Sequence, residues 1–256
     1  MKYAHNILGT GTSQGVPLIS CKCAVCNSSD ERDKRLRSSI SLSIGDLYIV
    51  IDSGPDFRQQ MLRDGATHLD AIVFTHEHKD HIAGLDDVRA FNFTMGEPMN
   101  VYCTEQVEVA LRREFHYAFS EKKYPGVPEI ILNRIENVPF KIKGVEFNPI
   151  EVLHFKMKVF GYRIGNFTYI TDANYIAEEE IQKIIGSEIL VLNALRREAH
   201  PSHFTFEEAL TLIERVQPKK AYLTHISHQL GKHEDVTLEL PENVHLAYDG
   251  LTFELN

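Results

Sequence analysis

The chain has 256 residues, of which 43% are hydrophobic, and its net charge at pH 7 is −9. This length and apolar content suffice for one large core or two smaller ones. The negative charge argues against sequence-independent nucleic-acid binding and so against nucleic acid as a partner. No apolar run approaches the ~18 residues of a membrane span, and the first residues lack the apolar core of a signal peptide. We therefore expect a cytoplasmic protein without a membrane partner. Residues 1–256 should form a single domain, and the sequence leaves open whether the chain forms a homodimer.

A predicted first strand, residues 3–8, leads into a glycine-rich loop from Gly9 to Pro17. This loop is not a dinucleotide-binding fingerprint, because its third glycine comes one residue late, Pro17 interrupts a helix start and no βαβ unit follows. We expect instead a tight loop that uses the backbone freedom of glycine near a functional site.

Three of the four cysteines lie within a polar loop at about residues 18–30, as Cys21, Cys23 and Cys26. Cysteines this close form a poor disulfide framework, and the fourth cysteine is remote in sequence. Three thiolates suit a tetrahedral structural zinc ion, which needs a fourth ligand. Reactive free cysteines or core packing are the alternatives.

Residues 38–44 and 47–51 predict a β-hairpin, because apolar residues alternate with serine in the first segment. Asp52 follows directly, and a short helix is predicted over residues 56–62. A carboxylate at the end of a strand can orient a metal-ligating histidine through a hydrogen bond. A turn or helix-capping role before Gly-Pro is the alternative.

The densest group of ligand-type side chains follows a predicted buried strand at residues 70–75 and precedes a helical pattern. Imidazole and carboxylate groups suit a first-row divalent metal, and a loop between a strand and a helix presents them on a rigid scaffold. The spacing can serve two neighbouring ions, one for each pair of side chains. A histidine-rich polar loop without function is the alternative. The four residues are His76, His78, Asp80 and His81.

A strand over residues 99–103 and a helix over 105–115 precede an aromatic, basic segment at residues 116–128 that prolines interrupt. We expect a loop there, because the segment has neither helical nor strand periodicity. It can form a rim over the site. The sequence leaves open whether the side chains of this segment contact the substrate; the candidates are Tyr117, Lys122, Lys123 and Tyr124.

Two more ligand-type residues each follow a strand-like run. His154 comes after residues 145–152, and Asp172 after residues 167–170. Taken alone, a histidine in this position is usually structural and the aspartate would be an ordinary turn residue.

A helix over residues 176–185 and a buried strand over 189–193 precede His200 and His203, which lie just ahead of an amphipathic helix at 206–216. The two histidines compete for one functional role. In the alternative reading both are solvated, and Ser202 or Thr205 simply caps the helix.

The predicted strand at residues 221–224 ends in His225, and His228 follows three residues later. Because of this offset, the His228 side chain can point away from the site of His225 and reach a neighbouring loop. It is therefore our candidate for the fourth zinc ligand beside Cys21, Cys23 and Cys26.

The motif His-x-His-x-Asp-His at the end of a strand resembles the signature of the metallo-β-lactamase superfamily. The resemblance covers most of the chain and implies an α/β fold: a four-layer αβ/βα sandwich with two mixed sheets face to face, and a closing hairpin at residues 246–255. The pattern Cys-x-Cys-x-x-Cys together with Thr-His-x-Ser-His is narrower. It resembles the phosphoribosyl cyclic phosphodiesterase branch of the carbon–phosphorus lyase pathway type.

This resemblance assigns roles to the candidate residues. It implies two divalent ions, Zn²⁺ or Mn²⁺, and favours orientation of a ligand histidine as the role of Asp52. His203-Phe-Thr resembles the His-x-Thr element whose histidine is the proton donor, with His200 as its competitor and Asp80 as a further catalytic residue. The implied ligands are His76, His78 and His154 for one ion, Asp80, His81 and His225 for the other, and Asp172 between them.

The implied enzyme is a hydrolase of a small sugar or nucleotide phosphodiester, in particular a cyclic one, attacked by a hydroxide that bridges two metals ~3.5–4 Å apart. An RNA-processing phosphodiesterase of the same superfamily is the first alternative, and the net charge of −9 argues against it. A metal-binding sensor without turnover is the second, since a fold does not fix a function.

Overall fold

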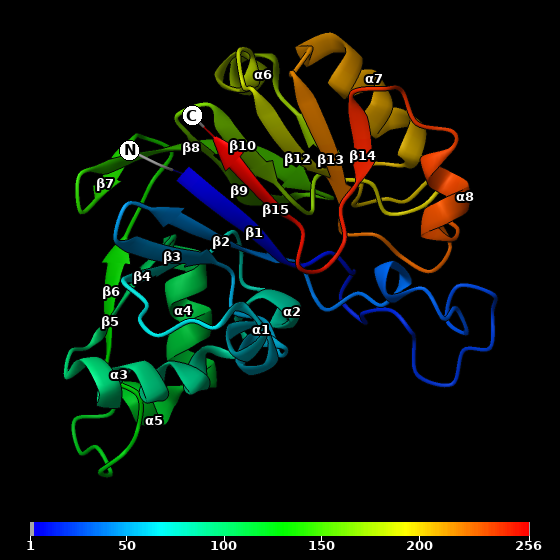
Figure 1. Ribbon diagram of the computed structural model, residues 1–256. Coiled ribbons are helices and arrows are strands. Elements are labelled where there is room, and N and C mark those ends of the chain that lie inside the picture. The colour runs from blue at the N-terminus through cyan, green and yellow to red at the C-terminus, as the bar shows by residue number, and fades with distance from the viewer. Residues whose placement is uncertain (1–2, 256) are drawn as a thin grey trace. The chain divides into compact units, whose positions relative to one another are not determined.

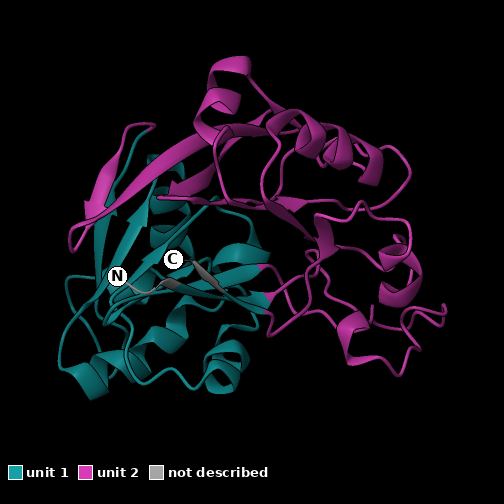
Figure 2. Ribbon diagram, turned by 45° about the horizontal axis from the view of Figure 1, so that its top comes forward, with its two compact units in different colours: residues 1–8, 39–136, 252–256 teal, residues 9–38, 137–251 magenta. Residues whose placement is uncertain are grey.

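The computed structural model describes residues 3–255 (Figure 1), which divide into two compact units (Figure 2). Of these residues, unit 1 takes in 3–8, 39–136 and 252–255, and unit 2 takes in 9–38 and 137–251. Each unit has its own sheet and its own apolar core, so the fold is mixed α/β with two sheets. Within the described range, no helix is both long and apolar enough to cross a bilayer.

Unit 1 contains a seven-stranded sheet whose middle strands are completely buried. The predicted hairpin is present as β2 and β3, which pair antiparallel around Gly45, and β3, β4, β5 and β6 then run parallel. In sheet order the strands are β15 (Thr252–Leu255), β1 (Tyr3–Gly9), β2 (Ser39–Ile44), β3 (Leu47–Ile51), β4 (Ala71–Val73), β5 (Met99–Cys103) and β6 (Ile130–Arg134).

The helices of unit 1 supply one side of its core, in which Phe57, Leu85 and Leu111 are almost fully buried. The Thr104 hydroxyl accepts a hydrogen bond from the Val107 amide and so caps the longest of these helices at its start. The helical segments are α1 (Phe57–Asp64), α2 (Lys79–Ile82), η2 (Leu85–Val88), α3 (Arg89–Met95), α4 (Glu105–Glu114) and α5 (His116–Phe119).

Unit 2 contains an eight-stranded sheet in which β12, a run of five buried residues, is central. Strands β10, β12, β13 and β14 are parallel, whereas β8, β9 and β10 pair antiparallel. The path through the sheet is β11 (Tyr175–Ile176), β8 (Val145–His154), β9 (Met157–Ile164), β10 (Phe167–Ile170), β12 (Ile189–Asn193), β13 (Lys220–Thr224) and β14 (Val244–Leu246), with β7 (Phe140–Ile142) paired to β8.

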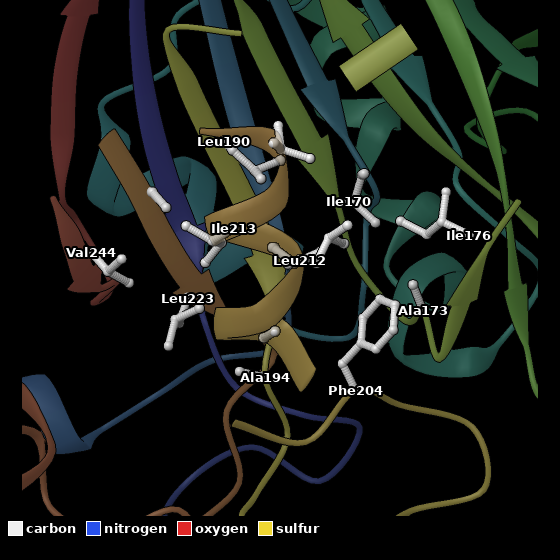
Figure 3. Packing of buried hydrophobic residues seen from close by; sticks show 14 of the residues in the cluster. Ile170, Ala173, Ile176, Leu190, Ala194, Phe204, Leu212, Ile213, Leu223 and Val244 are labelled. Atoms are coloured by element: carbon white, nitrogen blue, oxygen red, sulfur yellow. The ribbon is translucent and has the colours of Figure 1, made fainter. Parts of the chain in front are cut away.

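Helix α7 (Phe206–Val216) packs on this sheet through one apolar face, from which Leu212 and Ile213 contribute to the core around Leu190 (Figure 3). A capping box fixes its first turn, because Thr205 and Glu208 each bond the backbone amide of the other. The remaining helices of unit 2 are η1 (Glu31–Asp33), α6 (Glu178–Ile184) and α8 (His233–Thr237).

Strand direction explains why the candidate residues of each unit gather at one edge of its sheet. In unit 2, β8 runs in the same direction as β10 and β13, because β9 is antiparallel to both β8 and β10. Their carboxyl ends therefore bring His154, Asp172 and His225 to the same edge. In unit 1 the parallel pair β3 and β4 does the same for Asp52 and His76.

Two sequence-based expectations about elements are wrong. Residues 246–255 form no hairpin: β14 pairs in parallel with β13 in one sheet, and β15 pairs antiparallel with β1 in the other. The segment at residues 116–128 is also not entirely loop, because it begins with the one-turn helix α5. A single helical turn is too short to produce a periodic apolar pattern.

Candidate active site

Asp52 is completely buried at the end of β3 and accepts three hydrogen bonds. Its Oδ1 accepts from the Thr75 amide at 2.8 Å, and its Oδ2 accepts from the Thr75 hydroxyl at 2.8 Å and from His81 Nδ1 at 2.7 Å. Burial raises the pKa of Asp52, while the bonds from His81 and Thr75 oppose that rise by stabilising the carboxylate. Asp52 therefore holds the His81 ring in one orientation, whereas the alternative helix-capping role has no support, since no side-chain cap bond forms at α1.

The ligand-type residues of unit 1 lie in the loop after β4 and in the first turn of α2. The His76 ring centroid is 4.7 Å from that of His78 and 4.1 Å from that of His81, and His78 is exposed while the other two are buried. His81 Nε2 lies 3.2 Å from Asp80 Oδ2. Two ligand atoms of one tetrahedral zinc ion are separated by about 3.4 Å. The Nε2 of His81 and the Oδ2 of Asp80 therefore have the separation expected of two ligands that bind the same ion.

Asp172, 2% exposed, is the centre of the corresponding group in unit 2. Its Oδ1 lies 3.1 Å from His203 Nε2 and 3.3 Å from His225 Nε2. His154, Asp172 and His203 each offer a ligand atom within 4.8 Å of the others. The donor set of unit 2 thus fits a divalent metal ion as well as that of unit 1.

Four of the candidate histidines share one arrangement: each donates its Nδ1–H to an oxygen atom. A hydrogen bond of this kind fixes the tautomer in which Nε2 carries the lone pair, as is usual for metal-ligating histidines. The four bonds are His76 to Thr75 Oγ1 at 3.0 Å, His81 to Asp52 Oδ2 at 2.7 Å, His154 to the Ser202 carbonyl at 2.8 Å and His225 to Ser38 Oγ at 3.0 Å. These rings are therefore prepared to bind through Nε2.

His203 lies between Asp172, which is near its Nε2, and His200, which is near its Nδ1. His203 is in direct contact with Asp172, whereas the Nδ1 of His200 lies 3.1 Å from the Nδ1 of His203. Burial and, secondarily, His203 and Arg196 lower the pKa of His200. The structure therefore places His203 next to the candidate metal ligands and His200 one hydrogen bond farther away.

The backbone at three of these residues adopts left-handed conformations that are uncommon outside glycine. The φ angles of Asp52, Asp172 and His225 are 65°, 56° and 54°. Such conformations are unfavourable and cluster at functional sites, where surrounding contacts enforce them. Each of the three residues lies just beyond the end of a strand.

The three clustered cysteines and His228 also come together, within unit 2. The Sγ atoms of Cys21 and Cys23 lie 3.4 and 3.3 Å from His228 Nδ1, and all four ligand atoms are within 4.8 Å of one another. A tetrahedral zinc ion separates its sulfur and nitrogen ligands by about 3.5 Å. All three cysteines are free thiols, so the geometry fits a closed zinc site and not a disulfide.

Local hydrogen bonds prepare one of these thiols for metal binding. The backbone amide of Cys26 and the ring of His228 lower the pKa of Cys23 to about 6, so the thiolate is its main form at neutral pH. Burial raises the pKa of Cys26 to about 11. A bound cation would reverse that shift, because it favours the thiolate directly.

Several residues that support the site were not found by sequence reasoning. A Cβ on Gly84 would lie 2.1 Å from the Gly54 carbonyl oxygen, so only glycine allows the end of α2 to approach the Asp52 loop. In unit 2, the Asn193 amide group bonds both the amide and the carbonyl of Ala173 and fixes the loop that carries Asp172. Only the strand-end position of Asn193 gave any signal in the sequence.

The predicted rim at residues 116–128 lies in unit 1. The Tyr117 hydroxyl donates to the Asp86 carboxylate, and burial raises the pKa of Tyr117 to about 12. Lys122, Lys123 and Tyr124 are exposed. Substrate contact by these side chains stays a prediction.

Residues 48–226, which carry most of these candidates, match the family model of the β-lactamase superfamily domain. The chain belongs to the metallo-β-lactamase superfamily. Its fold is accordingly the mixed α/β metallo-β-lactamase fold with two sheets.

Individual relatives refine this placement. A crystal structure of a diphosphatase from the PhnP family is 40% identical, covers 100% of this chain and 98% of its own, and superposes with a TM-score of 0.94, which places the chain in that family. An octanoyltransferase of Porphyromonas gingivalis is 40% identical over 96% of this chain, yet the chain spans only 50% of that relative. Zn²⁺-bound PqqB from Methylobacterium extorquens, 19% identical with a TM-score of 0.79 over 98% of this chain and 100% of its own, shares the fold.

Proposed function

We propose that this chain is a metal-dependent phosphodiesterase that hydrolyses a small sugar or nucleotide phosphodiester, cyclic esters included. The observation that carries the proposal is the set of four histidines held in the Nε2-ligating tautomer by oxygen acceptors at Nδ1. The 40% identity to a PhnP-family diphosphatase supports phosphate-ester chemistry over other hydrolytic reactions of the superfamily.

The proposed ligand set holds two divalent ions, Zn²⁺ or Mn²⁺. The spacing of His81 Nε2 and Asp80 Oδ2 supports it on one side, and the contacts of Asp172 with His225 and His203 support it on the other. The proposed ligands are His76, His78, His154, Asp80, His81, His225 and Asp172.

In this proposal the bound ions would generate a nucleophile at neutral pH and offset the charge that develops on the phosphate. Asp80 orients the attacking water, and Asp52 keeps the His81 ring in place. His203 holds a proton at Nε2 and donates it to the departing sugar oxygen. His200 orients this ring, because a bond between two Nδ1 atoms requires one ring to donate and the other to accept.

The first test is turnover by the metal-loaded protein. We expect hydrolysis of bis(p-nitrophenyl) phosphate that chelation abolishes and Zn²⁺ or Mn²⁺ restores. An octanoyl thioester should be run beside it, since one relative is an octanoyltransferase. Turnover of the thioester alone would replace the proposed function, and binding of metal without any turnover would favour the sensor alternative. Selective cleavage of RNA would favour the RNA-processing alternative.

We further propose that Cys21, Cys23, Cys26 and His228 hold a structural zinc ion. Such a site has no open position and should stabilise the fold without taking part in catalysis. Cys23→Ser should therefore contain one zinc ion fewer per chain and melt at a lower temperature. Its turnover per folded molecule in the cold should stay close to that of the parent protein.

Elemental analysis, thermal unfolding and a turnover assay at low temperature check this prediction together. Lys22→Ala is the matched control, because Lys22 is exposed between two of the cysteines. Unchanged zinc content in the Cys23 variant, or an equal effect of the Lys22 substitution, would show that these thiols bind no structural ion.

A further inference from the structure

The turn between β8 and β9 places an aromatic side chain at the edge of the unit 2 sheet that carries the candidate ligands. His154 pairs with Met157 across the two strands, so Phe155 and Lys156 form a two-residue turn. Phe155 is the first residue beyond the strand end that brings His154 to this edge, and it is 57% exposed. A substrate bound beside His154 would therefore lie within reach of an exposed aromatic ring.

The backbone of Phe155 adopts a conformation that phenylalanine disfavours. Its φ angle is 59°, and the first central residue of a two-residue hairpin turn with positive φ is usually glycine, asparagine or aspartate. A bulky side chain is strained in this left-handed region, and an exposed ring gains little from burial to offset the cost. Strain of this kind at the edge of a candidate site favours a functional role for the residue.

Hydrogen bonds fix the Phe155 turn to the loop that carries Asp172. The Oδ1 atom of Asn174 accepts from the Phe155 amide at 2.7 Å, and the Asn174 amide donates to the Leu153 carbonyl at 2.8 Å. Tyr175, which pairs with Leu153, is 54% exposed and adds a second aromatic side chain. The segment that supplies a proposed metal ligand thus also sets the position of Phe155.

The Phe155 ring has the chemistry of a stacking surface. Across residues 3–255, no aromatic ring stacks on that of Phe155, and the Nζ atom of Lys156 lies 5.4 Å from the ring centre. A protein interface needs about 20–30 residues a side, far more than this pair of exposed aromatic side chains. A nucleobase, in contrast, can stack on a single aromatic ring.

We propose that Phe155 is a specificity-determining residue that stacks on the nucleobase of a nucleotide substrate. The inference rests on the proposed phosphodiesterase function and narrows its substrates from sugar or nucleotide esters to nucleotide esters. Every base has a flat π face, so stacking alone should accept adenine and uracil. The ring binds and places the ester, and it takes no part in proton transfer.

Two cyclic esters with the same reacting bond test this inference: adenosine 2′,3′-cyclic phosphate, and the 2,3-cyclic phosphate of methyl ribofuranoside, which has no base. We expect the parent protein to prefer the nucleotide by about 10–100-fold in kcat/KM, the range of one base–aromatic stack. Phe155→Ala should lose most of that preference through a higher KM, with a much smaller change on the base-free ester. Phe155→Trp should keep the preference, as should Phe93→Ala, which removes an exposed ring from α3.

Thermal unfolding separates this role from a structural one. Phe155→Ala should melt close to the parent protein, because the ring is exposed. Phe155→Gly should melt higher than Phe155→Ala, since glycine adopts the left-handed conformation without strain, yet it should also lose the preference for the nucleotide. A clearly lower melting temperature of Phe155→Ala would show that the ring serves the fold and would overturn the inference.

The outcomes keep the two proposals apart. If the parent protein hydrolyses both cyclic esters equally well, or if Phe155→Ala and Phe93→Ala behave alike, the phosphodiesterase function stands and the role of Phe155 is overturned. Turnover of bis(p-nitrophenyl) phosphate without turnover of the nucleotide has the same meaning. If the metal-loaded protein hydrolyses none of these esters, the proposed function fails and the inference falls with it.

Discussion

Replacing Asp172 with alanine should remove most of the bound metal and nearly all phosphodiester turnover. Asp172 is 2% exposed, and its Oδ1 contacts both His203 Nε2 and His225 Nε2. Without this carboxylate, Asp80 is the one anionic group left among the proposed ligands to compensate the charge of the ions. The loss in metal affinity should exceed the ~10–100-fold that removal of an outer hydrogen-bond partner costs. Elemental analysis after desalting and turnover of bis(p-nitrophenyl) phosphate measure the two effects.

Two further variants make this result interpretable. Asp172→Asn keeps the shape of the side chain and its packing, so it should lose metal for lack of charge and not for lack of structure. Asp235→Ala removes an exposed aspartate from α8 of the same unit and should change neither quantity. Full activity of Asp172→Ala with its metal retained would rule out a two-metal site built around this residue.

Strand-end placement is what made the ligand candidates visible in the sequence. His76, Asp172 and His225 each follow a short apolar run, and the structure shows each of them at the end of a strand. Parallel strands present their carboxyl ends at one edge of a sheet, which explains why the structure brings the candidates of a unit together. The Cys21 loop and His228 were joined on ligand chemistry and on the offset of His228 from His225, and their ligand atoms lie within 4.8 Å of one another.

What the sequence did not reveal depends on contacts between distant segments. Ser38 holds His225, which is 187 residues away, and nothing in the local sequence around Ser38 marks it for that role. Gly84 is required because α2 ends against the Gly54 carbonyl, a close approach that only the folded chain creates. The supposed closing hairpin failed for the same reason, because each of its segments finds a better partner far along the chain, β13 for β14 and β1 for β15.

Hydrogen bonds from neighbouring side chains and amides also explain how residues of the candidate site are held in uncommon backbone conformations. Asp52 has φ 65° and accepts three hydrogen bonds, which together outweigh a local cost of order 1–3 kcal/mol. The loop of Asp172, with φ 56°, is fixed in the same way by the two bonds of Asn193. Rigid placement of this kind reduces the reorganisation needed when a metal or substrate binds.

His203→Ala should reduce hydrolysis of a sugar phosphodiester by ~10²–10⁴-fold, the usual contribution of a general acid. The loss should be far smaller on p-nitrophenyl esters, because p-nitrophenolate is a stable anion that leaves without a proton. Steady-state kinetics on the two kinds of ester measure this contrast. His203 is favoured over His200 because its Nε2 lies 3.1 Å from Asp172 Oδ1, while the Nδ1 of His200 lies 3.1 Å from the Nδ1 on the far side of the His203 ring.

Metal content separates this role from a second one that the geometry allows. His203 offers a ligand atom within 4.8 Å of those of His154 and Asp172, so a structural part in metal binding would also lower turnover. A proton donor leaves metal content unchanged on substitution and affects only esters with poor leaving groups, whereas a ligand lowers metal content and affects all esters alike. His200→Ala is the matched comparison, and we expect a smaller loss because His200 acts only through His203. An equal loss of His203→Ala on both kinds of ester, or a larger loss for His200→Ala, would assign the proton donor elsewhere.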